Sequence, residues 1–355
     1  MSLPPPAATL SRAGGHLAFS PAALQGNCPL CGQIGSPLHA DLDDRLGNAP
    51  GRWTLRSCRP CRVVWMTPRP PKSDFAGIYR DYFTHSPAEP EPGRKRTREK
   101  VRDATLARLL GLPSTGMPRM LRMAGALAAR VPRYQESVRA STLWLERMEN
   151  GKLLDVGCGD GTFLNRMRDL GWTVQGIDPD LRAVEQARSR FALDVVAAPF
   201  EEHRFPGDSF DAVVASHVIE HVHDPLSMLR ECRRILKPGG KLVVLTPNYL
   251  GLQHRWLGTA WAGIDCPRHL FLFSRRSLGR GCEIAGLRVV ALRTTARGAK
   301  NFWLFSRERD NPGGPASRRK PLGLRMEAFF YDWIERSALL FWPDAGAEIL
   351  LIAGK

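Results

Sequence analysis

Three glycines and an acid, placed where apolar strands end, are the residues whose spacing most clearly indicates chemistry. The apolar segment 152–156 runs into a turn that contains Gly157, Gly159 and Gly161, and a second apolar segment ends in Asp178. Glycines permit a tight bend and let a ligand approach the backbone. A carboxylate at the second position can accept both hydroxyls of a ribose. Turn and acid together predict a site for a nucleoside-containing ligand.

Four of the eight cysteines have the spacing of metal ligands. Cys28 and Cys31 form one C-x2-C pair, and Cys58 and Cys61 form a second pair after 26 intervening residues. Two thiolate pairs on tight turns complete a tetrahedral zinc shell with no open position, which predicts a structural metal. Two disulfides or a chance pairing are the alternatives, and a reducing compartment disfavours disulfides.

The composition suits a globular protein: 355 residues with 43% hydrophobic content can form one α/β domain with additions. No apolar run approaches the roughly 18 residues of a spanning helix. Residues 1–20 contain prolines and lack the apolar core of a signal peptide, so we expect a cytoplasmic protein.

The formal net charge of +16 is concentrated in one stretch. Between residues 94 and 139, twelve Lys and Arg side chains stand against three acids. A solvated helical surface accounts for such a stretch, and so does binding to an anionic substrate, a nucleic acid or an anionic membrane surface. Charge alone does not choose among them.

Shifts in composition divide the chain into four parts. We expect a disordered leader (1–25), a zinc ribbon with its following segment (26–85), a basic linker with helical cover (86–149) and an α/β domain (150–355). Strands and helices alternate in the last part, which predicts a mostly parallel sheet. It carries inserts over 247–273, expected to be irregular, and 296–345, expected to be loop-like up to residue 323.

The glycine turn, preceded by Asp155, reads G-x-G-x-G rather than the G-x-G-x-x-G of dinucleotide folds. It resembles motif I of class I S-adenosylmethionine (SAM) methyltransferases. Three later segments agree in order: 210–215 resembles the fourth strand, 217–222 the motif after it, and 236–244 the turn and fifth strand. The resemblance implies a Rossmann-like core with a mostly parallel seven-stranded sheet and transfer of the SAM methyl group.

The same resemblance implies cofactor roles by position. Asp155 would orient the turn or the methionine ammonium, and Asp178 would bind the ribose. Phe200 would stack on adenine and Glu201 would accept its amine, unless the acid only begins a helix. The full set of expected cofactor residues is Asp155, Gly157, Gly159, Gly161, Asp178, Phe200, Glu201, Ser216 and His217.

The ribbon with residues 61–70 and 79–83 resembles bacterial zinc-ribbon methyltransferases, many of which act in sugar, polysaccharide or secondary-metabolite pathways. The segment 267–274 (Pro-Arg-His-Leu-Phe-Leu-Phe-Ser) also resembles theirs and would lie over the cofactor mouth. His269 is the first candidate for a general base, and Arg268 is a candidate anchor for an anionic acceptor. A purely structural role for both is the alternative.

His217, Glu220 and His221 have the spacing of one face of a helical turn. Some small-RNA and ubiquinone-pathway O-methyltransferases have E-x-x-E-H here and bind a divalent metal, and this chain has histidine in place of the first glutamate. A metal site, a general base at His221 or His217, and a polar group that holds the substrate-side loop are the open interpretations.

We therefore expect a SAM-dependent methyltransferase that acts on a small molecule by C- or O-methylation, on a sugar, polysaccharide precursor or lipid-linked metabolite, with SAM as co-substrate and a structural zinc. A zinc-containing RNA methyltransferase is the first alternative, because basic charge would bind phosphates. A non-catalytic SAM-fold adaptor is the second. The residues predict no oligomeric state.

Residues 326–342 combine periodic aromatics with four charged side chains (Glu327, Asp332, Glu335 and Arg336). A segment of this length and charge should not span a bilayer. The apolar side chains either cover the sheet or a dimer partner, or form an interfacial helix or lipid-acceptor wall.

Overall fold

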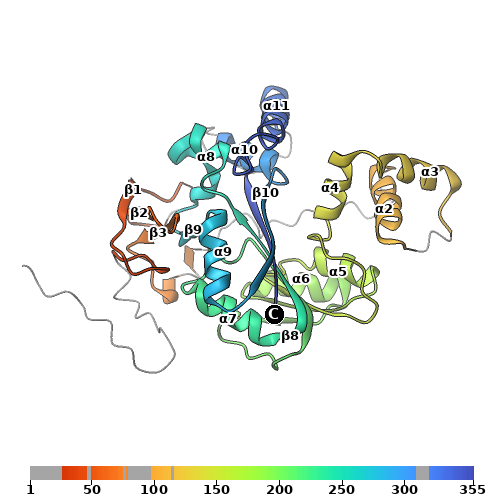
Figure 1. Cartoon of the computed structure of the whole chain (residues 1–355), viewed down its shortest axis with the longest axis horizontal. Coiled ribbons are helices and arrows are strands. Elements are labelled where there is room, and N and C mark those ends of the chain that lie inside the picture. The colour runs from red at the N-terminus through yellow and green to blue at the C-terminus, as the bar shows by residue number, and fades with distance from the viewer. Residues whose placement is uncertain (1–25, 46–48, 75–76, 79–96, 113–115, 309–319) are drawn as a thin grey trace, which may run out of the picture.

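The computed structural model describes residues 26–45, 49–74, 77–78, 97–112, 116–308 and 320–355 (Figure 1). The expected leader, 1–25, and the segment 79–96 lie outside the described residues. Among the helices described, none is both long and apolar enough to cross a membrane.

A seven-stranded sheet with the order β10-β11-β8-β7-β4-β5-β6 forms the centre of the molecule (Figure 1). Five strands are parallel: β4 (Lys152–Val156), β5 (Thr173–Asp178), β6 (Val195–Ala197), β7 (Phe210–Ser216) and β8 (Leu236–Pro247). β11 (Glu348–Gly354) runs antiparallel to both β8 and β10 (Arg288–Thr295). The predicted Rossmann-like fold is confirmed, and the carboxyl ends of the parallel strands share one edge, where ligands bind in such sheets.

Alternate residues of the buried strands face two different helical layers. Leu154 packs in a core with side chains of α7 (Pro225–Ile235) and α9 (Arg275–Ile284). Leu153 packs on the other face with side chains of α2 (Thr97–Leu110), α4 (Pro132–Ala140) and α5 (Thr162–Asp169). α6 (Leu181–Phe191) closes a smaller core beside β5 and β6, and α3 (Arg119–Ala128) packs on α2.

A second sheet, of order β1-β2-β3-β9, lies at the left of the molecule in Figure 1. β1 (Ser36–Leu42), β2 (Trp53–Cys58) and β3 (Val63–Thr67) come from the expected ribbon, whereas β9 (Phe271–Leu272) belongs to the insert after β8. Val64 pairs with Leu272, and Trp65 pairs with Phe271. The ribbon is thus joined strand to strand with the insert that contains His269.

Two inserts are more regular than the sequence predicted. The segment 247–273 contains α8 (Leu252–Leu257) and β9, and the expected loop 296–323 contains α10 (Ala299–Glu308). α10 packs on the fold: Ala299 is fully buried, and its carbonyl accepts a 2.7 Å hydrogen bond from Gln253 Nε2. Tertiary packing commonly outweighs helix propensity in this way.

The apolar segment near residue 330 forms α11 (Leu322–Ala338). The side of this helix that packs on the protein is not the aromatic side that the sequence suggested. Its buried residues are Ala328, Tyr331, Asp332 and Glu335, whereas Trp333 is 58% exposed. The interpretation that these aromatics cover the sheet is therefore wrong for the outward-facing ones.

Candidate active site

The glycine turn adopts backbone conformations that require glycine. Gly157, Gly159 and Gly161 have φ angles of +73°, +53° and +75°, a region that side chains with a β-carbon rarely occupy. A β-carbon at Gly157 would lie 2.5 Å from Val218 Cγ2. The turn therefore lies directly against the segment that follows β7.

Asp178 stands at the carboxyl end of β5 and bridges two backbone segments. Its Oδ2 accepts a 2.8 Å hydrogen bond from the Gly159 amide, and its Oδ1 accepts a 2.9 Å bond from the Asp180 amide. A carboxylate oxygen has a second lone pair, so the same group can also accept ribose hydroxyls. Its ribose role remains a prediction that this geometry permits.

Asp155 is a nearly buried acid in β4, 4% exposed and in register with Gly176 and Val214. Burial and the negative charge of Asp178 raise the pKa of Asp155 well above its usual value. A cationic group bound nearby would favour the ionised form, as expected of a residue that orients a ligand ammonium.

Phe200 and Glu201, the two residues expected to contact adenine, differ in their exposure to solvent. Phe200 is buried with its ring centroid 6.3 Å from that of Phe205. The Glu201 carboxylate is exposed and lies 3.3 Å from Lys72 Nζ, in the short helix η2 (Lys72–Asp74). Ser216 is the last residue of β7. The adenine roles of Phe200 and Glu201 remain predictions.

His217 has a different role from the expected base. Its Nε2 lies 2.7 Å from Glu348 Oε1, and its Nδ1 lies 3.3 Å from Glu220 Oε1. Burial opposes the charged ring, but hydrogen bonds to these two carboxylates raise the pKa of His217 to about 10. A protonated ring with both nitrogens facing carboxylates has no free site for a proton, so these contacts favour His221 and His269 over His217 as the general base, and each of these roles stays a prediction.

The other two candidate bases come together. The rings of His221 and His269 are 4.6 Å apart, centre to centre. Each ring is oriented by a backbone carbonyl, because His221 Nδ1 donates to Arg268 O at 3.1 Å and His269 Nδ1 donates to Gly263 O at 2.8 Å. Glu220, 0% exposed, completes a group whose ligand-type atoms lie within 4.8 Å of one another, close enough to hold a metal ion. His269 rather than His217 belongs to this group.

Arg268 is buried in an ion-pair network. Its guanidinium lies 2.5 Å from Asp44 Oδ1 and 2.9 Å from Asp265 Oδ1, with all three side chains nearly inaccessible. These carboxylates outweigh the effect of burial and raise the pKa of Arg268. The expectation that Arg268 anchors an anionic acceptor is wrong, because two carboxylates already neutralise it. Since Asp44 lies in the ribbon, the network joins the ribbon to the His269 segment.

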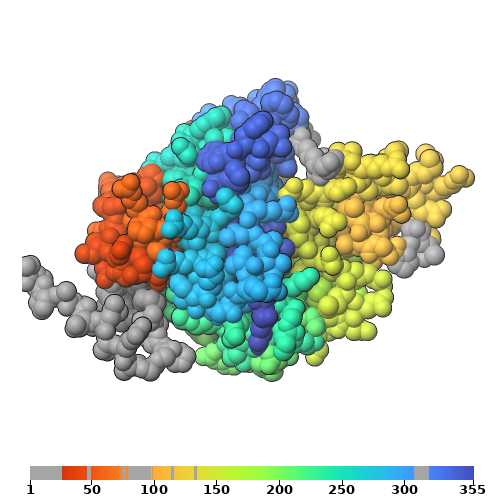
Figure 2. All heavy atoms as spheres, in the orientation of Figure 1, coloured from red at the N-terminus to blue at the C-terminus, as the bar shows by residue number. Residues whose placement is uncertain are grey.

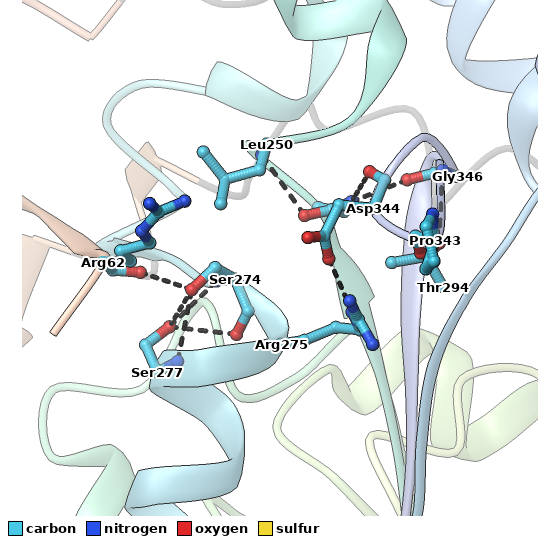
Figure 3. Close-up of polar contacts among 10 residues, drawn as sticks. Arg62, Leu250, Ser274, Arg275, Ser277, Thr294, Pro343, Asp344 and Gly346 are labelled. Carbon is cyan, nitrogen blue, oxygen red and sulfur yellow. Dashed lines mark hydrogen bonds and ion pairs between the residues drawn. The ribbon is translucent and has the colours of Figure 1, made fainter. Parts of the chain in front are cut away.

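Further bonds hold the insert between the ribbon and the segment after β7. The Leu270 amide donates to Glu220 O at 2.7 Å, and the Met66 amide donates to Leu270 O at 3.0 Å. Ser274, which caps α9, donates to Arg62 O at 2.6 Å (Figure 3). His269 therefore depends for its position on the ribbon as well as on the core.

The four predicted cysteine ligands converge: their sulfur atoms lie within 4.8 Å of one another. Both pairs sit on the same kind of turn, since the Gly32 amide donates to Cys28 O and the Arg62 amide donates to Cys58 O. No disulfide joins any of the cysteines, all eight of which fall in the described ranges. Four closely spaced thiols on two such turns fit a tetrahedral zinc ion.

Sequence reasoning missed Glu348, which holds His217. Glu348 is the first residue of β11 and lies opposite Pro247, at the end of β8. An antiparallel strand begins where its parallel neighbours end, so an acid that opens the last apolar strand belongs to the edge that carries the site. The position of this acid at the start of the last apolar strand was the sequence feature that could have identified Glu348.

Comparison with known proteins agrees with this arrangement. A family model described as "Methyltransferase domain" matches residues 123–292. Ubiquinone biosynthesis O-methyltransferases are similar over shorter stretches. The human mitochondrial protein is 38% identical over 112 residues, 29% of this chain and 30% of that protein. The Roseobacter denitrificans protein is 34% identical over 145 residues, 36% of this chain and 58% of that protein. The chain thus spans about a third to somewhat over half of these relatives.

Solved structures of similar outline include SAM-dependent methyltransferases from Mesorhizobium loti and Archaeoglobus fulgidus. The first is 18% identical, covers 62% of this chain and 97% of its own, and has a TM-score of 0.42. The second is 20% identical, covers 65% and 93%, and has a TM-score of 0.41. The region similar to a methyltransferase domain, residues 123–292, contains the glycine turn and the five parallel strands β4 to β8 of the Rossmann-like sheet.

Proposed function

We propose that this chain transfers the methyl group of SAM to a hydroxyl oxygen of a small-molecule acceptor. The observation that supports this most is the close packing of Gly157 against Val218, because the Val218 carbonyl accepts from the amide of His221, whose ring lies next to that of His269. Because the methyl group of SAM is already activated, the protein must mainly align donor and acceptor, exclude water and take up the acceptor proton.

His221 and His269 are suited to the proton step. Burial and the neighbouring His269 lower the pKa of His221 to about 4, so its ring is neutral near neutral pH. A neutral imidazole can accept a hydrogen bond or a proton from an acceptor hydroxyl. The partly matching relatives named O-methyltransferases favour oxygen over carbon as the acceptor atom.

Methyl transfer from labelled SAM into fractionated cell extract tests the proposal, with the chemical linkage of the label identified in the product. We expect label in a small-molecule fraction as an O-methyl group. His269→Ala and His221→Ala should each lower kcat, on the order of 10²-fold or more, with SAM affinity unchanged. His203→Ala is the matched control, since His203 packs on Phe205 and does not belong to the group of Glu220, His221 and His269.

Cofactor binding is tested separately by calorimetry. Asp178→Ala should weaken SAM binding by about 1.5–3 kcal/mol, because it removes charge-assisted hydrogen bonds. The exposed Asp194, bonded to Gln175, provides the control Asp194→Ala. Label found only in RNA would favour the RNA alternative, and SAM binding without any methyl transfer would favour the adaptor.

A further inference from the structure

The outward face of α11 is an apolar stripe. Its exposed large side chains recur at helical spacing and continue past the end of the helix: Leu322, Met326, Phe329, Phe330, Trp333, Leu340 and Phe341. Phe330 is 57% exposed and Phe341 is 89% exposed. In Figure 2 the atoms of this segment form the upper rim of the molecule. Contiguous apolar surface of this kind marks an interaction site.

The orientation of α11 is held by its polar inner face. Asp332 pairs with Arg336 at 3.0 Å, and Arg336 also donates to Ala296 O. Glu335 accepts hydrogen bonds from the Ala347 amide at 2.6 Å and from Gln253 at 3.2 Å. Turning the aromatic side chains inward would break all these contacts and would also expose Tyr331, which is 2% exposed and stacks on Trp303. The contacts of the inner face therefore fix the orientation of α11 and keep its aromatic side chains exposed.

α3 carries a second stripe. Met120, Met123 and Leu127 are all more than half exposed and have the spacing of one side of the helix, and Val131, just beyond its end, is also more than half exposed. Gly125 faces the other way, and a β-carbon there would lie 2.8 Å from Ala104 of α2. Arginines at 119, 122 and 130 flank the stripe, and residues 116–135 contain no acid. A helix with apolar and basic faces is typical of a membrane interface.

We propose that α3 and α11 together dock the protein on the surface of an anionic lipid bilayer. α11 lies at the top of the view in Figure 1 and α3 at its right-hand end, so contact with both stripes requires a broad and deformable partner. The charge of the partner follows from the arginines around α3 and from the net charge of +16. A second copy of the chain would bring the same basic surfaces together at an electrostatic cost. α11 itself has 17 residues and would lie in the interface without crossing it.

Flotation of the whole chain with vesicles tests the docking. We expect the protein to float with phosphatidylcholine vesicles that contain phosphatidylglycerol and to stay behind with pure phosphatidylcholine vesicles. Added salt should release it, because salt screens the arginine–phosphate attraction. The double variant Phe330→Ser, Trp333→Ser should bind at least about tenfold more weakly, since two aromatic anchors are lost. Arg119→Glu with Arg122→Glu should abolish the preference for the anionic lipid.

Leu181→Ser is the matched control, because Leu181 is a similarly exposed side chain, 56%, on α6. All these positions are exposed, so circular dichroism should show folded variants. Failure of the wild-type chain to float with anionic vesicles would overturn the proposal. So would a dimer in light scattering that the Phe330/Trp333 variant dissociates while vesicle binding is absent, since the stripe would then join two copies. Neither result depends on methyl transfer.

Discussion

His217 Nε2 lies 2.7 Å from Glu348 Oε1, although 131 positions separate the two residues in the chain. The contact joins the segment after β7 to the first residue of β11, across the end of β8. Glu220 on the other side of the ring lies 3.3 Å away, and its pKa falls to about 2, since the nearby His217 outweighs the effect of burial. An imidazolium between two buried carboxylates therefore joins these segments of the chain.

Replacing His217 by glutamine should destabilise the fold more than it impairs the chemistry. Glu220 would lose the ring, and Glu348 would keep only Arg297 at 3.3 Å. Removing one partner of a fully buried ion pair costs about 3–5 kcal/mol, and the loss should be smaller here because the His217 side chain is 34% exposed. Urea unfolding measures the loss, with His203→Gln as the control. A variant as stable as the wild type would contradict this account of the network.

The pH dependence of that loss has a defined sign. The pKa of His217 is raised from 6.5 to about 10 in the folded chain. Its stabilisation is fully present below about pH 6.5 and is lost as pH rises through about 10. The difference in unfolding free energy between wild type and His217→Gln should therefore shrink toward pH 10. A difference that stays constant would assign the stabilisation to packing instead.

The parallel core could be predicted from the sequence because its strands and turn depend on residues that are neighbours in the chain. Buried parallel strands such as β4 and β7 read as apolar runs, and the turn after β4 needs glycine for its backbone. The sequence indicates that Glu348 opens the last strand, but its contact with His217 could not be predicted, since it depends on how β11 pairs with β8. The inward face of α11 was also hidden, because Asp332 and Glu335 are buried only through partners elsewhere in the fold.

SAM binding should tighten as pH rises through the titration of Asp155. Burial and Asp178 favour the neutral carboxyl in the free protein, whereas a bound methionine ammonium would favour the carboxylate, so binding should release a proton. Calorimetry in buffers of different ionisation heat measures this release. Asp155→Asn should bind SAM more weakly and lose that part of the pH dependence. Identical proton release by the variant would place the ammonium away from Asp155.

Loss of the ribbon metal should lower turnover. Reduced protein is expected to contain one zinc, and Cys28→Ser should lose it. β3 pairs with β9, and Asp44 pairs with Arg268, next to His269, so a loosened ribbon should reduce kcat while SAM affinity changes little. Cys282→Ala is the control, since Cys282 lies in α9 outside the cluster. A metal-free Cys28→Ser protein with full kcat would show that His269 is held without the ribbon.

Glu335 should make the stability of the C-terminal part depend on pH near neutrality. Burial raises the pKa of Glu335 from 4.5 to about 8. The folded state thus favours the protonated form, and this contribution, fully present below about pH 4.5, is lost as pH rises through about 8. Between these values the cost grows by up to about 1.4 kcal/mol per pH unit.

Glu335→Gln should remove this dependence while keeping the bond to the Ala347 amide. The new amide nitrogen would take the place of Oε2, which accepts from Gln253 Nε2, so the variant loses this one hydrogen bond at every pH. Unfolding free energies near pH 6 and pH 9 should therefore differ less in the variant than in the wild type. Glu327→Gln, an exposed change on the same helix, should follow the wild-type profile. Parallel profiles for all three proteins would mean that Glu335 is ionised throughout, with its two donors outweighing burial.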